Sequence, residues 1–170
     1  MHERLAREIK GLIMGIKGFK PDRVEIKAAG NHRSPFSYRR FEPPARVLLV
    51  DDEREFVQTL SERLQLREID SVIAYDGESA MDMVREDSPE VMVLDLQMPG
   101  IDGIEVLKLV KAGNPEIEVV ILTGHGTDAD RDVCMKLGAF AYLEKPVDID
   151  TLSETLKRAE DRMRSRKSGL

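Results

Sequence analysis

The sequence predicts an α/β fold, in which a five-stranded parallel sheet is doubly wound, with helices on both faces. Between residues 46 and 163, short apolar runs alternate five times with segments of helical periodicity. An unbroken apolar run such as Val47–Val50 is typical of a strand that is buried on both faces. Because strands that alternate with helices need right-handed crossovers, we expect the sheet to be parallel throughout.

The periodicity assigns the regular segments in order along the chain. The expected strands are Val47–Val50, Ser71–Ala74, Val91–Asp95, Val119–Leu122 and Ala139–Glu144. The expected helices are one whose apolar face carries Phe56, Leu60 and Leu64, then Gly77–Glu86, Gly103–Val110, Thr127–Leu137 and about Ile149–Met163. We interpret Arg164, Arg166 and Lys167 as a basic tail that follows the last helix.

The composition is that of an ordinary globular protein and excludes several function classes. The chain has 170 residues, of which 34% are charged and 41% hydrophobic, enough for one domain and an extension. Its single cysteine, Cys134, excludes an internal disulfide and argues against a cysteine-based metal site. No apolar run approaches the roughly 20 residues of a membrane helix. Because the N-terminus also lacks a secretory pattern, we expect a cytoplasmic protein.

The charge is divided unevenly between the N-terminal residues and the α/β domain. Residues 1–46 carry a net charge of +6, so the remainder carries −12 within a total of −6. We therefore expect residues 1–45 to form a basic N-terminal extension, with a helix over about residues 3–18 and then a linker. The apolar face of that helix consists of Leu5, Ile9, Leu12, Ile13 and Ile16. We expect the extension to pack on an acidic domain, its own or that of a dimer mate. The alternative is a tether for nucleic acid or an anionic membrane.

Polar side chains stand where four of the expected strands end. Asp51 and Asp52 follow the first strand, Asp95 the third, Thr123 the fourth and Lys145 the fifth. In open α/β sheets the chemistry takes place just beyond the carboxyl ends of the strands, so we expect these residues to meet. Three neighbouring carboxylates repel one another unless a cation is present. Oxygen ligands of this kind suit Mg²⁺, and the ammonium of the lysine adds positive charge.

These residues resemble the receiver domain of two-component response regulators, over residues 46 to about 163. The resemblance depends on four motifs, each at the end of the appropriate strand: Asp51-Asp52, Asp95-Leu96-Gln97-Met98-Pro99-Gly100, Thr123-Gly124 and Lys145-Pro146. It implies a flavodoxin-like (βα)5 domain over residues 46–166.

The resemblance also implies a role for each residue of the site. Asp95 would be the phosphoacceptor. Asp52 and Asp95 would hold Mg²⁺ directly and Asp51 through water, with the backbone carbonyl of Gln97 as a further ligand. Lys145 would contact the phosphoryl oxygens.

Two further residues match the positions of a conformational switch. Thr123 stands at the switch hydroxyl position and Tyr142 at the aromatic switch position. A movement of the threonine toward the phosphoryl group would open space into which the tyrosine can rotate. The site would thereby be coupled to the surface formed by the fourth helix, the fifth strand and the fifth helix of the domain.

The function implied by the resemblance is a phosphorylation-controlled signalling switch rather than a turnover enzyme. Its partners would be a histidine kinase or phosphotransfer protein and an unidentified downstream protein. A homodimer through the N-terminal extension, or through the surface defined above, is a further candidate. Too few residues follow the last helix for a DNA-binding domain, so we expect none.

Two other functions remain as alternatives. An aspartyl-phosphate phosphatase of the haloacid dehalogenase type needs a second acid two residues after the nucleophile, where this chain has Gln97. A module that binds its partners without phosphorylation would not need the acidic site, which is intact here.

Overall fold

The computed structural model describes residues 47–169, so the predicted N-terminal helix and linker lie outside the described residues. The strands are β1 (Val47–Val50), β2 (Ser71–Ala74), β3 (Val91–Leu94), β4 (Glu118–Thr123) and β5 (Ala141–Glu144). The helices are α2 (Arg54–Gln65), α3 (Gly77–Glu86), α4 (Gly103–Gly113), α5 (Asp128–Lys136) and α6 (Ile149–Lys167). Every expected strand and helix of the domain is therefore present.

The five strands form one parallel sheet in the order β2-β1-β3-β4-β5. The chain adds β2 on one side of β1 and then β3, β4 and β5 on the other side. This reversal of strand order makes the sheet doubly wound, as in flavodoxin-like folds, and confirms the predicted fold class. The register is continuous across the sheet, since Leu48 lies between Val72 on β2 and Met92 on β3.

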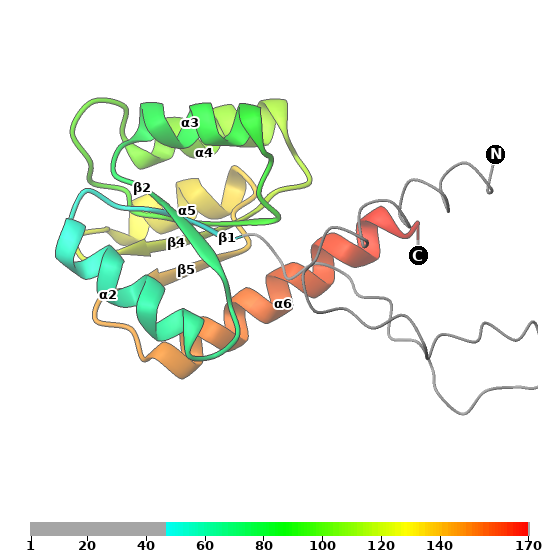
Figure 1. The fold of residues 1–170 in the computed structure, drawn as a ribbon. Coiled ribbons are helices and arrows are strands. Elements are labelled where there is room, and N and C mark those ends of the chain that lie inside the picture. The colour runs from blue at the N-terminus through cyan, green and yellow to red at the C-terminus, as the bar shows by residue number, and fades with distance from the viewer. Residues whose placement is uncertain (1–46, 170) are drawn as a thin grey trace, which may run out of the picture. The chain divides into compact units, whose positions relative to one another are not determined.

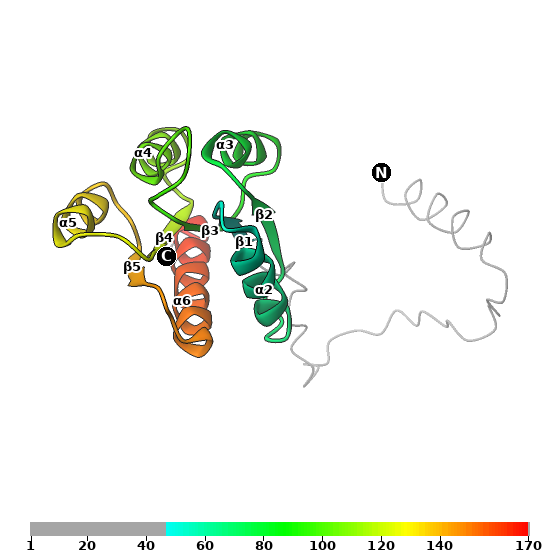
Figure 2. The same cartoon turned by 90° about the vertical axis from the view of Figure 1, so that its left-hand side faces the viewer.

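Helices cover both faces of the sheet, with α3, α4 and α5 on one face and α2 and α6 on the other (Figures 1 and 2). Successive residues of a strand point to opposite faces. Leu48 therefore belongs to the core beneath α3 and α4, whereas Leu49 belongs to the core beneath α2 and α6. Both are almost fully buried, which explains the unbroken apolar runs of the sequence.

The last helix is longer than predicted, and the interpretation of its basic end as a tail is wrong. Arg164 pairs with Glu160 one turn earlier and lies 3.9 Å from Glu90. The guanidinium of Arg166 donates a hydrogen bond of 2.9 Å to Glu118, a fully buried carboxylate at the start of β4. These arginines keep α6 helical because their partners lie along the helix and at the sheet edge. Within residues 47–169, no helix is long and apolar enough to cross a membrane.

Candidate functional site

Three carboxylates converge at the carboxyl edge of the sheet. Asp51, Asp52 and Asp95 each contribute an oxygen atom, and these atoms all lie within 4.8 Å of one another. Asp51 and Asp95 are buried, whereas Asp52 is exposed. The sheet itself places the two buried residues, since the backbone N–H of Asp51 bonds to Ala74 and that of Asp95 bonds to Val50.

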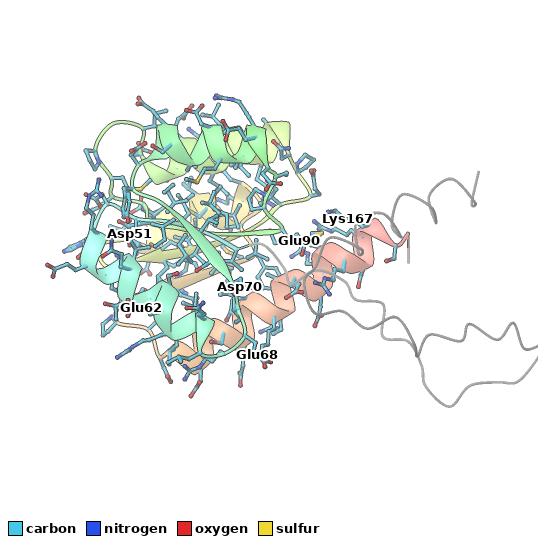
Figure 3. All side chains as sticks on the ribbon, in the orientation of Figure 1. Asp51, Glu62, Glu68, Asp70, Glu90 and Lys167 are labelled. Atoms are coloured by element: carbon cyan, nitrogen blue, oxygen red, sulfur yellow. The ribbon has the colours of Figure 1, made fainter. Side chains whose placement is uncertain are left out.

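The carboxylate cluster lies at the opposite end of the sheet from the arginine-bound end of α6. Figure 3 shows Asp51 at one side of the domain, with Glu90 and Lys167 at the other. The arginines of α6 thus bind glutamates at the amino edge of the sheet, away from the acidic cluster.

The turn that carries Asp95 is fixed by the start of α4. The side chain of Asp95 accepts a hydrogen bond of 2.9 Å from the backbone N–H of Leu96. The carbonyl of Leu96 in turn accepts from the N–H of Gly103, at 3.0 Å. A Cβ atom on Gly103 would overlap the carbonyl oxygen of Asp95 and lie 2.7 Å from the Cα of Leu96. Only glycine therefore allows α4 to begin so close to the carboxylate.

Lys145 reaches the cluster from the end of β5. Its Nζ donates hydrogen bonds to Asp51 Oδ2 at 2.7 Å and to Glu53 Oε1 at 2.9 Å. The same ammonium lies 4.3 Å from the centre of the Phe56 ring, within reach of a cation–π interaction. The backbone N–H of Glu53 also donates to Asp51, at 2.8 Å. One ammonium is therefore shared by a carboxylate of the cluster and a neighbouring glutamate.

Burial and charge shift the pKa values of these groups in opposite directions. Burial raises the pKa of Asp51, an effect that the Lys145 hydrogen bond only partly offsets and the charge of Asp95 adds to. Burial lowers the pKa of Lys145, but its bonds to Asp51 and Glu53 outweigh this and raise it overall. The Lys145 hydrogen bond lowers the pKa of Glu53. The lysine therefore stays charged. The positive charge near Asp51 does not fully compensate for the burial of its carboxylate.

These oxygen atoms fit a divalent cation. A hard cation such as Mg²⁺ binds carboxylate oxygens and retains water molecules as its remaining ligands. The raised pKa of Asp51 indicates that an additional positive charge would stabilise its ionised form. The exposed position of Asp52 leaves the solvent side of the cluster accessible.

The two predicted switch residues are both buried and carry polar hydroxyl groups. Thr123 ends β4 and is 1% exposed, and Tyr142 lies in β5 and is 9% exposed. Among the described residues, neither hydroxyl has a hydrogen-bond partner. A buried polar group without a partner costs about 1–3 kcal/mol, so this pair is a local source of instability. Burial also raises the pKa of Tyr142.

A groove beside Asp52 connects the loops that follow β3 and β4. Its lining includes Gln97, Met98 and His125. The side-chain amide of Gln97 donates a hydrogen bond of 3.2 Å to the backbone carbonyl of His125, which links the two loops. The metal-ligand role of the Gln97 backbone carbonyl stays a prediction.

The sequence reasoning missed three contributors to this site. Glu53 and Phe56 both contact the ammonium of Lys145, although neither was assigned a role. Gly126 faces the hydroxyl group of Tyr142 and the Cγ2 methyl group of Thr123. A signal existed for Glu53, which directly follows the acidic pair, but nothing in the sequence connects it with a lysine 92 positions later.

Comparison with known proteins identifies the class of this domain. Residues 47–157 match the model of the response regulator receiver domain, so the chain belongs to that family. The cluster of Asp51, Asp52 and Asp95 is typical of the Mg²⁺ site and phosphorylation site of receivers.

Individual relatives agree with this assignment. The transcriptional regulatory protein CpxR of Escherichia coli K12 is 39% identical over 101 residues, which are 59% of this chain and 43% of CpxR. The C4-dicarboxylate transport transcriptional regulatory protein DctD of Pseudomonas aeruginosa is 35% identical over 127 residues, 74% of this chain and 27% of DctD. The chain therefore spans less than half the length of these relatives.

Solved receiver structures superpose on most of the chain. The receiver domain of the Francisella response regulator 1452 has a TM-score of 0.66 at 30% identity, covering 69% of this chain and 98% of that one. A CheY-like receiver from Methanospirillum hungatei has a TM-score of 0.70 at 22% identity, covering 72% and 98%. The second likeness concerns the fold alone.

The close packing at Gly103 leads to a stability prediction. Gly103→Ala should destabilise the domain by about 3 kcal/mol, since the added methyl group must displace the backbone that carries Asp95. Urea denaturation measures this change. The control is Gly113→Ala at the other end of α4, where a Cβ meets nothing within 4 Å and stability should not fall. Equal stability of the two variants would contradict the prediction.

Proposed function

We propose that the domain is a signalling switch in which Asp95 accepts a phosphoryl group from a histidine kinase or phosphotransfer protein. The observation that carries this proposal is the position of Asp95: a buried carboxylate beside two others, one of which is paired with the ammonium of Lys145. Membership of the receiver family supports a histidine kinase as the partner.

The chemistry needs a nucleophile and neutralisation of charge. A carboxylate oxygen of Asp95 attacks phosphorus, the bond to the donor breaks, and an aspartyl phosphate remains. Phosphoryl transfer depends mainly on positioning and on stabilising the charge of the phosphoryl oxygens. Lys145, held beside the cluster by Asp51 and Glu53, would bind these oxygens.

The acidic residues would hold Mg²⁺ in the arrangement implied by the family. Asp52 and Asp95 would bind it directly, Asp51 through water, and the backbone carbonyl of Gln97 would add a ligand. When bound, the ion would supply positive charge to the phosphoryl oxygens. Its charge would also favour the ionised form of Asp51, whose pKa is raised by burial.

The response to phosphorylation would begin at Thr123. Its buried hydroxyl, without a partner among residues 47–169, would donate a hydrogen bond to the new phosphoryl group. The movement would change the packing of Tyr142 and so the surface formed by α5, β5 and α6. The surface would then have two alternative packings. A partner protein or a second copy of the chain would bind one of them more tightly than the other. The chain would then be a regulated module rather than a turnover enzyme.

Replacing the phosphoacceptor tests the proposal directly. Asp95→Asn should abolish labelling by acetyl phosphate, because the amide cannot act as the nucleophile. Labelling is measured by mass spectrometry of the intact protein. Asp70→Asn, which changes one exposed carboxylate directly before β2 in the same way, should be labelled like the wild type. Undiminished labelling of Asp95→Asn would assign the wrong nucleophile.

The metal assignment is tested by Mg²⁺ titration. Asp52→Ala should weaken Mg²⁺ binding about tenfold or more, yet leave the domain folded, since its side chain is exposed. Removing one of several like charges should also raise the metal-free stability slightly. Isothermal titration calorimetry measures the affinity, with Asp70→Asn again as the control. Equal affinities in wild type and Asp52→Ala would exclude the assignment.

The switch hydroxyl is tested separately from the phosphoacceptor. Thr123→Ala should still be labelled on Asp95, because the hydroxyl senses the phosphoryl group without carrying it. The variant should however show a reduced change in size or partner binding upon addition of beryllofluoride. Small-angle scattering with and without beryllofluoride measures this response. A response as large as that of the wild type would contradict the role of Thr123.

A further inference from the structure

The loop between β4 and α5 has room for the buried ring of Tyr142 because residue 126 is glycine. A Cβ atom on Gly126 would overlap the hydroxyl oxygen of Tyr142 and lie 2.9 Å from its Cζ. It would also lie 2.9 Å from the Cγ2 of Thr123. Carbon atoms do not approach other atoms so closely, so any side chain at this position would displace the ring.

Space, rather than backbone conformation, requires glycine at position 126. Among the described residues, the glycines with positive φ are Gly100, Gly138 and Gly169, and Gly126 is not one of them. An L-residue could therefore adopt the backbone of Gly126 without strain. The nearby Gly124 differs, since a Cβ there would meet only carbons of Lys145 at 3.8 Å, an ordinary contact.

Apolar packing within the core beneath α3 and α4, rather than a hydrogen bond, holds the ring in place. Its hydroxyl has no hydrogen-bond partner among residues 47–169. Its outer side is covered by the guanidinium of Arg131, 4.9 Å from the ring centre, which also pairs with Glu144 at 2.9 Å. Both side chains of that pair are largely exposed, and exposed ion pairs open at little cost. The covering helix α5 is also weakly anchored, since Cys134 is its one buried residue.

We propose that Gly126 is a positioning residue that admits Tyr142 to its buried position before any phosphorylation. A side chain at position 126 would turn the ring outward, beneath or past Arg131. The residue would thereby set the fraction of unphosphorylated molecules in which the ring is already buried. The inference rests on the proposed switch role of Tyr142 for its functional meaning, but the position of the ring is measurable without phosphorylation.

Nitration of the unphosphorylated full chain by tetranitromethane tests the proposal. The side chain of Tyr142 is protected in the wild type and should become accessible in Gly126→Ala. A shift from a minor outward state to a predominant one raises the nitration rate of Tyr142 about tenfold. Peptide mass spectrometry assigns the reaction to each tyrosine. Tyr75, which contacts Arg54 and Gln58 away from this loop, is the internal reference.

The matched control is Gly124→Ala, which makes the same substitution two residues earlier in the same loop. Because its Cβ has room, the nitration rate of Tyr142 should stay at the wild-type value. An unchanged rate in Gly126→Ala would overturn the proposal. An equal increase in both variants would also overturn it, because stiffening of the loop would then be the cause.

A double-mutant cycle provides a second measurement that does not need an intact tyrosine. Gly126→Ala should raise the equilibrium constant of unfolding about tenfold in the wild-type background, and much less in the Tyr142→Ala background, where the space is free. Equal effects in both backgrounds would overturn the proposal. Neither measurement uses a phosphodonor, so a failure of Asp95 labelling would contradict the proposed function and leave this inference standing.

Discussion

The attraction between Lys145 and the carboxylates at the edge of the sheet is the interaction on which the site depends. A parallel sheet brings the carboxyl ends of its strands together, and here it places Asp51 and Asp95 side by side in buried positions. Like charges in such a place repel one another. The ammonium, 2.7 Å from Asp51, offsets part of this repulsion. The remaining deficit of positive charge is what suits the site to a cation.

The two edges of the sheet contrast in how their charges are balanced. At the amino edge, buried Glu118 pairs with Arg162 and Arg166, which anchor α6, and with Lys111 of α4. At the carboxyl edge, negative charge exceeds positive charge and two hydroxyls lack partners among residues 47–169. Positive side chains therefore surround the buried carboxylate at the amino edge, whereas the acidic cluster at the carboxyl edge stays short of positive charge.

The sequence alone determined the fold and the identity of the acidic residues. Four consecutive apolar residues, as in Val91–Leu94, are typical of a strand that is buried on both faces in a parallel sheet covered by helices. The rule for crossovers then leaves few topologies. Because the edge of such a sheet is where its strands end, the residues directly after the strands, Asp51 and Asp95 among them, could be predicted to meet.

The tertiary structure decided which distant residues complete the site. Glu53 and Lys145 are 92 positions apart and meet because β1 and β5 end at the same edge, a proximity that has no local signal. The role of Gly126 is equally invisible in the sequence, since it depends on the position of the Tyr142 ring rather than on backbone conformation. The end of α6 also depends on tertiary contacts, because Arg166 is bound by a glutamate of β4. Periodicity reports the burial of a segment, whereas such contacts depend on how the finished sheet brings segments together.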